Sequence, residues 1–127
     1  MDTEDTSRAA ASHHGRRSLD GRHADVLVIG AGISGIGAAR ALRTRFLHRT
    51  VVVVEAQDDH GGTWRTHRYP GVRSDSDLFT YGYRHRPWRG PAIAGGDAIL
   101  DYLGEVVEEE GLASDIHLHH RVTALRW

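Results

Sequence analysis

The sequence contains no cysteine, no lysine and no asparagine. Without cysteine the chain has no disulfide, no thiolate nucleophile and no cysteine ligand for zinc or an iron–sulfur cluster. Without lysine it has no Schiff-base amine and no phosphate-loop lysine, which excludes the usual nucleoside-triphosphatase loop. No apolar run reaches the roughly 18 residues that a bilayer span requires. These absences exclude thiol chemistry, lysine chemistry and a transmembrane segment of ordinary length.

The remaining composition suits one globular domain of 127 residues. Sixteen basic residues oppose 17 acidic ones, so no excess of positive charge indicates a nucleic-acid partner. Residues 1–23 carry charge, serine and histidine without a periodic apolar pattern, which predicts a disordered N-terminal arm. The arginine pair at positions 16 and 17 lacks the apolar stretch of an export signal after it, so we expect a cytoplasmic protein.

Residues 24–55 carry the pattern of a β-α-β unit. Residues 24–29 form a near-continuous apolar run, typical of a central strand that is covered on both faces. Residues 33–46 predict a helix, and residues 51–55 predict a second buried strand. The apolar face of the helix would comprise Ile33, Ile36, Ala39, Leu42 and Phe46. This order predicts an α/β, Rossmann-like fold of three layers with a parallel sheet.

The second half of the chain begins with a long segment, residues 56–96, that has no sustained period and is predicted to be mostly loop. Asp97 is then a candidate N-cap for a helix that ends at Gly111. Its apolar face would comprise Ile99, Leu100, Leu103, Val106 and Val107. Residues 116–122 alternate apolar and polar side chains, which predicts a third strand.

The first motif is Gly30-x-Gly32-x-x-Gly35, which lies between the predicted strand and helix. Its glycines would allow a tight turn, close approach of a pyrophosphate and close packing of helix on strand. Helix amides and the Ser34 hydroxyl would face the diphosphate. Glu55, 20 residues beyond the last glycine, could accept hydrogen bonds from an adenosine ribose, which disfavours NADP here. The motif alone leaves FAD, NAD and a purely structural glycine turn open.

The second motif covers residues 61–75, Gly-Gly-Thr-Trp-Arg-Thr-His-Arg-Tyr-Pro-Gly-Val-Arg-Ser-Asp. It resembles the Gly-Gly-x-Trp signature of flavin-dependent monooxygenases of the Baeyer–Villiger type, which continues with four residues, Tyr or Phe, Pro-Gly, three residues and Asp. The segment Arg-His-Arg-Pro-Trp at 84–88 is similar to the branch that includes prodrug-activating monooxygenases of actinobacteria. By this resemblance, residues 24–127 are the N-terminal part of an FAD-binding domain.

The resemblance also implies roles for individual residues of the second motif. FAD contacts are expected from Gly62, Thr63, Trp64 and Arg65. Asp75 is expected beside the flavin as the catalytic candidate, where it would help to orient the reactive centre.

Three other positions are expected to meet the cofactors, and two of the roles have structural alternatives. Arg73 and Ser74 would touch the nicotinamide cofactor, and the backbone of Val122, on the third strand, would meet the adenine. Trp64 could instead be an aromatic plug that packs on a loop, and Asp75 a turn or helix-cap carboxylate, a role that Asp77 could also fill. For Arg84, Arg86 and Arg89, the alternative interpretation is a solvated basic face.

The resemblance implies an activity that needs more chain than is present. Such enzymes bind FAD, reduce it with NADPH, capture O2 as a flavin C4a-peroxide and oxygenate a ketone or a sulfur compound. No second glycine triplet and no NADPH domain follow in this sequence. We therefore expect the chain to be the FAD-binding segment of such a monooxygenase, inactive alone and prone to self-association through uncovered strands. The alternatives are a stand-alone, non-catalytic FAD- or NAD-binding module and half of an NAD-dependent dehydrogenase.

Ten histidines raise the question of a metal site. On a strand, His117 and His119 would share one face while His120 points to the other. No carboxylate lies at ligand spacing from them. We therefore expect surface histidines and no bound metal.

Overall fold

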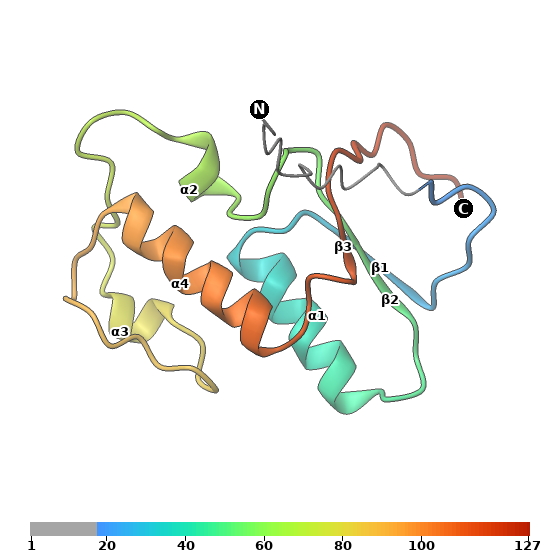
Figure 1. The fold of residues 1–127 in the computed structure, drawn as a ribbon, viewed down its shortest axis with the longest axis horizontal. Helices are drawn as coiled ribbons and strands as arrows, with labels where there is room; N and C mark the ends of the chain where they lie inside the picture. The colour runs from blue at the N-terminus through green and yellow to red at the C-terminus, as the bar shows by residue number, and fades with distance from the viewer. Residues whose placement is uncertain (1–17) are drawn as a thin grey trace, which may run out of the picture.

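The structure is a computed structural model that describes residues 18–127. In chain order the elements are β1 (Val26–Ile29), α1 (Ile33–Arg45), β2 (Val51–Val54), α2 (Thr63–Thr66), α3 (Leu78–Tyr81), α4 (Gly96–Glu109) and β3 (Ile116–His117) (Figure 1). Residues 1–17 of the predicted arm, which covers residues 1–23, lie outside the described residues. Residues 18–23 form a turn, in which the amide of Arg22 donates to the carbonyl of Leu19 at 3.1 Å.

The strands form one parallel sheet in the order β1-β2-β3. β1 pairs with β2 from Val26 opposite Val51 to Ile29 opposite Val54. This arrangement confirms the predicted α/β fold with a β-α-β unit. Within residues 18–127, however, β1 is an edge strand, because no described strand pairs along its other side. The prediction that β1 is a central strand was therefore wrong for this part of the chain.

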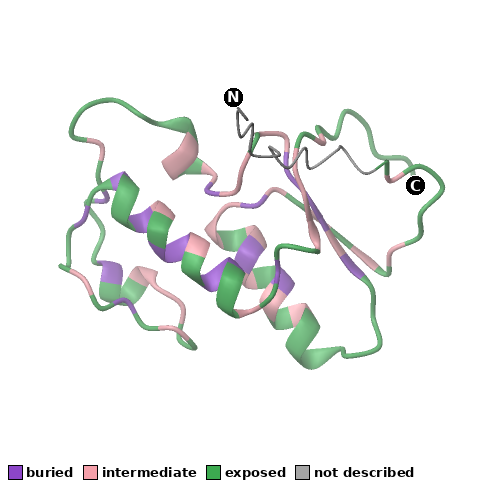
Figure 2. Cartoon of the chain, viewed as in Figure 1, coloured by how far each residue is buried: buried purple, intermediate pink, exposed green. Residues whose placement is uncertain are grey.

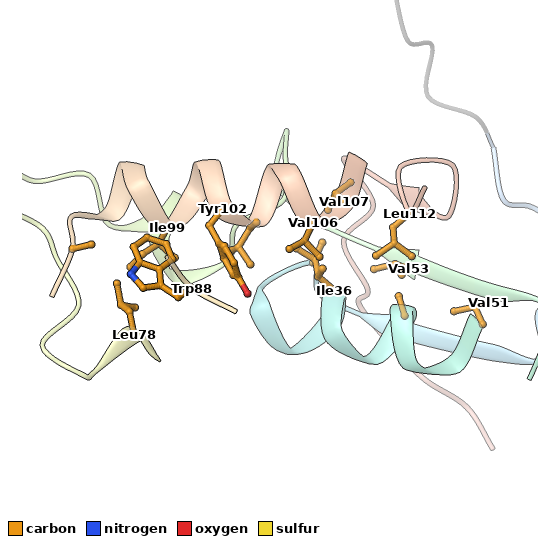
Figure 3. Packing of buried hydrophobic residues seen from close by; sticks show 14 residues of the cluster. Ile36, Val51, Val53, Leu78, Trp88, Ile99, Tyr102, Val106, Val107 and Leu112 are labelled. Atoms are coloured by element: carbon orange, nitrogen blue, oxygen red, sulfur yellow. The ribbon is translucent and has the colours of Figure 1, made fainter. Parts of the chain in front are cut away.

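The hydrophobic core lies between one face of the sheet and the helices α1 and α4. Ile36 of α1, Val53 of β2 and Leu103 of α4 are fully buried there. Figure 3 shows Val106 of α4 beside Ile36 of α1, and Figure 2 shows the buried residues of α4 along one side of the helix. A second part of the cluster gathers around Leu78 and Trp88, which pack against the N-terminal half of α4. The core thus ties the β-α-β unit to the long segment after it.

The opposite face of the sheet has no helix over it within residues 18–127 (Figure 1). Leu27 and Ile29 of β1 point to that side and are 46% and 54% exposed. A hollow over this face is lined by Leu27, Val52 and Val54 together with segments from both ends of the described chain. The described residues therefore form two of the three predicted layers, one helical layer and the sheet.

Hydrogen bonds between Asp25 and Thr50 connect the residues that precede β1 and β2. The Asp25 carboxylate accepts a hydrogen bond from the amide of Thr50 at 2.7 Å and another from its hydroxyl at 3.0 Å. The backbone bond from Thr50 is the largest cause that lowers the pKa of Asp25 to about 2. Asp25 therefore stays ionised at neutral pH and joins the starts of the two strands.

The helix boundaries correct three details of the sequence interpretation. Asp97 is not the N-cap of α4: the helix begins at Gly96 after the N-cap Gly95, and Asp97 lies in the first turn. There its carboxylate pairs with Arg68 at 3.2 Å. Phe46 lies just after α1 and is 53% exposed, so it is no part of the core. Segment 56–96 is mostly loop, as predicted, but contains the short helices α2 and α3.

β3 is shorter than the predicted strand 116–122, because the chain bends after His117. His119 adopts a positive φ of 59°, the only such non-glycine residue among those described. Its amide donates to Gln57, and the amide of His120 donates to Glu55. The bend ends the alternation of side chains, so the rings of His117 and His120 meet in a T-shaped, edge-to-face arrangement with their centroids 6.0 Å apart. The prediction that these two rings lie on opposite faces was wrong.

The packing of the core predicts a large loss of stability when a buried side chain of α4 is shortened. Leu103→Ala should lower the free energy of unfolding by about 2–5 kcal/mol, because a fully buried leucine leaves a cavity between α4 and α1. Leu47→Ala is the matched control: Leu47 is 79% exposed, and its loss should change stability by less than about 0.5 kcal/mol. Urea unfolding followed by circular dichroism measures both. Equal midpoints for the two variants would contradict this packing.

Candidate functional site

The glycine turn after β1 requires glycine for two separate reasons. Gly30 has a φ of 98°, and its amide donates to the carbonyl of Val54 at 2.8 Å, which extends the β1–β2 pairing into the turn. A Cβ atom on Gly35 would lie 1.9 Å from the carbonyl oxygen of Gly30. Only a glycine at 35 lets α1 pack this closely on the end of β1. Both predicted roles of these glycines match the structure.

The start of α1 presents amides that the helix itself cannot satisfy. Gly32 is the N-cap, it supplies no side-chain cap, and the first turn contains no acidic residue. The first amides of a helix have no partner within the helix, and they attract anions together with the helix dipole. Ser34 lies in this turn and is exposed. Such an uncapped turn beside close-packed glycines fits the diphosphate of a dinucleotide.

Glu55 follows β2 and turns its side chain under the glycine turn. The side chain is buried, with 7% of the residue exposed. Oε2 accepts the amide of Ala31 at 2.8 Å, and Oε1 accepts the amide of Gln57 at 2.9 Å. The structure therefore brings the predicted acid next to the predicted turn. Its contacts within the chain are with two backbone amides.

The glycine pair of the second motif, Gly61 and Gly62, lies across the glycine turn that follows β1. Gly61 and Gly62 have φ angles of 133° and 56°, values that favour glycine. The amide of Gly61 donates to the carbonyl of Ala31 at 2.9 Å. A Cβ on Gly62 would lie 2.9 Å from the Cα of Gly32, so the two backbones touch. The two motifs, which the sequence separates by about thirty residues, form one backbone crossing.

Helix α2 carries the next three predicted FAD contacts, Thr63, Trp64 and Arg65, and their side chains have different surroundings. Thr63 is exposed at its start. Trp64 packs inward: its indole N–H donates to the hydroxyl of Tyr81 at 3.2 Å, and its ring lies beside Gly96. Arg65 donates to Asp58 through two nitrogens, at 3.0 and 2.9 Å, and these bonds lower the pKa of Asp58. The Trp64 side chain thus has the contacts of an aromatic plug.

The predicted nicotinamide and catalytic residues lie on a loop that is anchored to the segment before α4. The amide of Ser74 donates to Ala94 at 3.0 Å, and its buried hydroxyl accepts the amide of Ser76 at 3.2 Å. Asp75 is 90% exposed in its side chain and lies 3.7 Å from Arg73. Ser74 therefore holds the loop, while Asp75 and Arg73 remain accessible.

Asp77 takes the helix-cap role that Asp75 could also have filled. Its Oδ1 accepts the amide of Phe79 at 2.9 Å at the start of α3. This leaves Asp75 without a capping role in α3. Arg86 also differs from a solvated basic face, because its guanidinium pairs with Glu105 and Glu109 of α4.

Val122 does not lie on β3, which contains only Ile116 and His117. Because the chain bends at His119, Val122 lines the hollow over the open face of the sheet together with Leu27 and Val54. No group of three or more histidine, aspartate or glutamate residues within 18–127 is arranged to hold a metal ion.

Tyr83 is a site residue that sequence reasoning missed. Its hydroxyl donates to the carbonyl of Ile33 in the first turn of α1, and its amide donates to the hydroxyl of Tyr102 at 2.8 Å. Burial raises the pKa of Tyr83 well above its ordinary value, so the phenol remains a donor. A Cβ on Gly37 would lie 2.9 Å from this ring. Gly37 is the only sequence signal for the contact, and it does not name its partner.

Comparison with known proteins first gives the class of domain. Residues 28–88 match the family described as the NAD(P)-binding Rossmann-like domain. The chain has the fold of this class of dinucleotide-binding domain, in agreement with the turn and sheet described above.

Relatives with known names narrow the class. The chain is 46% identical to the "Probable FAD-binding monooxygenase AlmA" of Acinetobacter baylyi over 107 residues, which are 84% of this chain and 22% of the relative. It is 44% identical to the FAD-containing monooxygenase EthA of Mycobacterium tuberculosis over 106 residues, 83% of this chain and 22% of the relative. The chain thus spans about a fifth of the length of these relatives.

A solved structure agrees with this assignment. A steroid monooxygenase, solved in its oxidised form bound to NADP, superposes with a TM-score of 0.73 at 37% identity, over 79% of this chain and 20% of that one. The resemblance to flavin monooxygenases of the Baeyer–Villiger type is confirmed by these matches. Among the helices of residues 18–127, none has the length and apolar character to cross a membrane.

The glycine turn gives a prediction that separates close packing from glycine content. Gly35→Ala should destabilise the fold by about 3 kcal/mol or more and abolish nucleotide binding, because its Cβ would collide with the Gly30 carbonyl. Gly104→Ala is the control on α4, where the nearest atom to a new Cβ is His60 Nε2 at 3.6 Å. That helical substitution should add about 0.5–1 kcal/mol of stability. Urea unfolding tests both, and a neutral Gly35→Ala would contradict the geometry.

Proposed function

We propose that this chain binds FAD as the FAD-binding segment of an NADPH- and O2-dependent flavin monooxygenase. The observation that carries the proposal is the uncapped start of α1, where the turn from Gly30 to Gly35 is held by Glu55 and Gly61. The chemistry of such a turn suits a diphosphate. The named relatives that match this chain are FAD-binding or FAD-containing monooxygenases, which favours FAD over NAD here.

In this proposal the residues bind and orient the cofactor. The backbone at Gly30, Gly32 and Gly35, with the Ser34 hydroxyl, holds the diphosphate, and Glu55 serves the ribose end. The flavin, when bound, supplies the oxygen-transfer chemistry. The loop from Gly62 to Arg65 lies along it, with Trp64 acting through its backbone because its indole is committed to Tyr81.

The remaining predicted contacts complete the site. Asp75 orients the reactive centre, and it is exposed and free of a helix-cap role. Arg73 and Ser74 lie toward the nicotinamide of NADPH, Arg73 through its exposed side chain and Ser74 through its backbone. Val122 meets the adenine from the segment after β3.

Further parts of the activity belong to a longer polypeptide in this proposal. The chain spans about a fifth of its relatives, and the NADPH domain and the substrate pocket would lie in the rest. Residues 24–127 would be the N-terminal part of the FAD domain, cytoplasmic and inactive alone. The substrate would be a small ketone or a sulfur compound, oxygenated beside the carbonyl or on the sulfur. The exposed residues Leu27 and Ile29 would favour self-association of the isolated segment.

Flavin retention tests the proposal directly. The protein, produced at its natural full length, should purify with the visible absorption of a flavin and release FAD on heat denaturation. With NADPH it should consume O2 faster when a ketone or a thioether is added. A folded preparation that retains no flavin would contradict the proposal. Flavin without NADPH-dependent O2 uptake would favour the stand-alone binding module instead.

Two neighbouring aspartates separate a role in the reaction from a role in the fold. Asp75→Asn should retain FAD and stability but slow substrate-dependent O2 uptake on the order of 100-fold, because the reacting groups lose their orientation. Asp77→Ala removes the cap of α3, which should cost about 1 kcal/mol of stability with little effect on O2 uptake. Oxygen-electrode rates and urea unfolding of both variants check this. If Asp75→Asn oxygenates at the wild-type rate, Asp75 has no part in the reaction.

A further inference from the structure

The peptide of Ala31 is held at both ends inside the glycine turn. Its amide donates to Glu55 Oε2 at 2.8 Å, and its carbonyl accepts the amide of Gly61 at 2.9 Å. Ala31 is fully buried. One partner comes from the end of β2 and the other from the loop before α2. We call these two hydrogen bonds the Ala31 clamp.

Ala31 immediately precedes Gly32, the N-cap of α1. The direction of the amides in the first turn depends on where this peptide lies, because no side chain caps the helix there. The crossing with Gly62, whose Cβ would approach Gly32 Cα to 2.9 Å, leaves the turn no room to shift toward the second loop. The clamp therefore sets the position of the amide array.

Every hydrogen-bonding group of Glu55 already has a partner within the chain. Its amide donates to the carbonyl of His117 at 2.9 Å, and its carbonyl accepts the amide of His120 at 2.8 Å. Oε1 accepts the amide of Gln57 at 2.9 Å. Hydrogen bonds to a carboxylate are stronger than those between neutral groups, and a buried carboxylate needs them. Glu55 is thus a rigid part of the turn before any nucleotide arrives.

We propose that Glu55 is a positioning residue for the diphosphate: through Ala31 it sets the helix amides in place, independently of any contact that its carboxylate makes with a ribose. This inference rests on the proposed nucleotide site. It separates two roles that a strand-end acid can have. A ribose acceptor matters only for ligands with ribose hydroxyls, whereas the clamp matters for every ligand that carries a diphosphate.

The test combines Glu55→Gln with two probes, ADP and 2′,3′-dideoxy-ADP, on full-length protein freed of flavin. The glutamine amide places an N–H group against one of the two backbone amides. The clamp predicts that Glu55→Gln weakens both ligands by about 10- to 100-fold, the range for a lost hydrogen bond to a charged group. Glu108→Gln, on an exposed glutamate of α4, should leave both affinities unchanged. Isothermal titration calorimetry gives the dissociation constants.

The outcomes distinguish the two proposals. If Glu55→Gln weakens ADP but changes dideoxy-ADP by less than about twofold, Glu55 acts on the ribose alone and the clamp is overturned. If the wild-type protein binds neither ADP nor FAD, the proposed function fails, and this inference fails with it.

A second measurement needs no variant and covers the case in which Glu55→Gln does not fold. Hydrogen exchange of the nucleotide-free wild-type protein, resolved by NMR, reports the amide of Ala31 directly. The clamp predicts exchange as slow as that of the amide of Val53 in β2, which bonds to Asp115 at 2.8 Å. Exchange of the Ala31 amide at the rate of an exposed loop would overturn the clamp.

Discussion

The crossing of two backbone segments, at Gly32 and at Gly62, is the constraint on which the site depends. A side chain at Gly62 would come within 2.9 Å of Gly32 Cα, so the contact requires a glycine at position 62. Backbone groups at this distance form hydrogen bonds that side chains would otherwise obstruct, such as that between Gly61 and Ala31. This contact fixes the glycine turn relative to the start of α2, and the hydrogen bond from the Ala31 amide to Glu55 fixes the turn relative to the end of β2. A shift in any of them would move the amides of α1.

Packing contacts in the rest of the described chain hold the two crossing segments in place. α1 is held at its first turn by Tyr83, and α4 packs along it through Leu103 and Val106. Trp64 joins α2 to α3 through Tyr81, so the loop that carries Asp75 is connected to the second glycine pair through packed side chains. The aromatic residues of the long segment are therefore mostly structural.

The face of the sheet opposite α1 and α4 is open, in contrast to the packed face. β1 is continuous in apolar residues, yet Leu27 and Ile29 are about half exposed within residues 18–127. The apolar pattern of a strand records the environment for which its side chains are suited. Burial of this face by further chain, in the same polypeptide or in another copy, would complete the third layer. The chain spans about a fifth of its relatives, which agrees with such a complement.

The sequence alone determined the local elements and the identity of the glycine turn. The spacing of apolar residues located β1, α1, β2 and α4 to within a few residues, because each element carries one continuous apolar stripe or run. The spacing of Gly30, Gly32 and Gly35 with Glu55 predicted a dinucleotide turn, since backbone sterics limit those positions to glycine. The residues of the second motif identified the family, and the comparisons confirmed it.

Only the tertiary structure decided which groups meet. The contact of Gly32 with Gly62, the two bonds on Ala31 and the hold of Tyr83 on α1 join segments far apart in the chain, and no local pattern specifies such partners. The bend at His119 depends on backbone bonds to Gln57 and Glu55, so alternation alone predicted too long a strand. The inward packing of Trp64 likewise depends on Tyr81, whose hydroxyl accepts the indole N–H. Periodicity reports burial, whereas the choice of partner depends on how buried surfaces fit together in three dimensions.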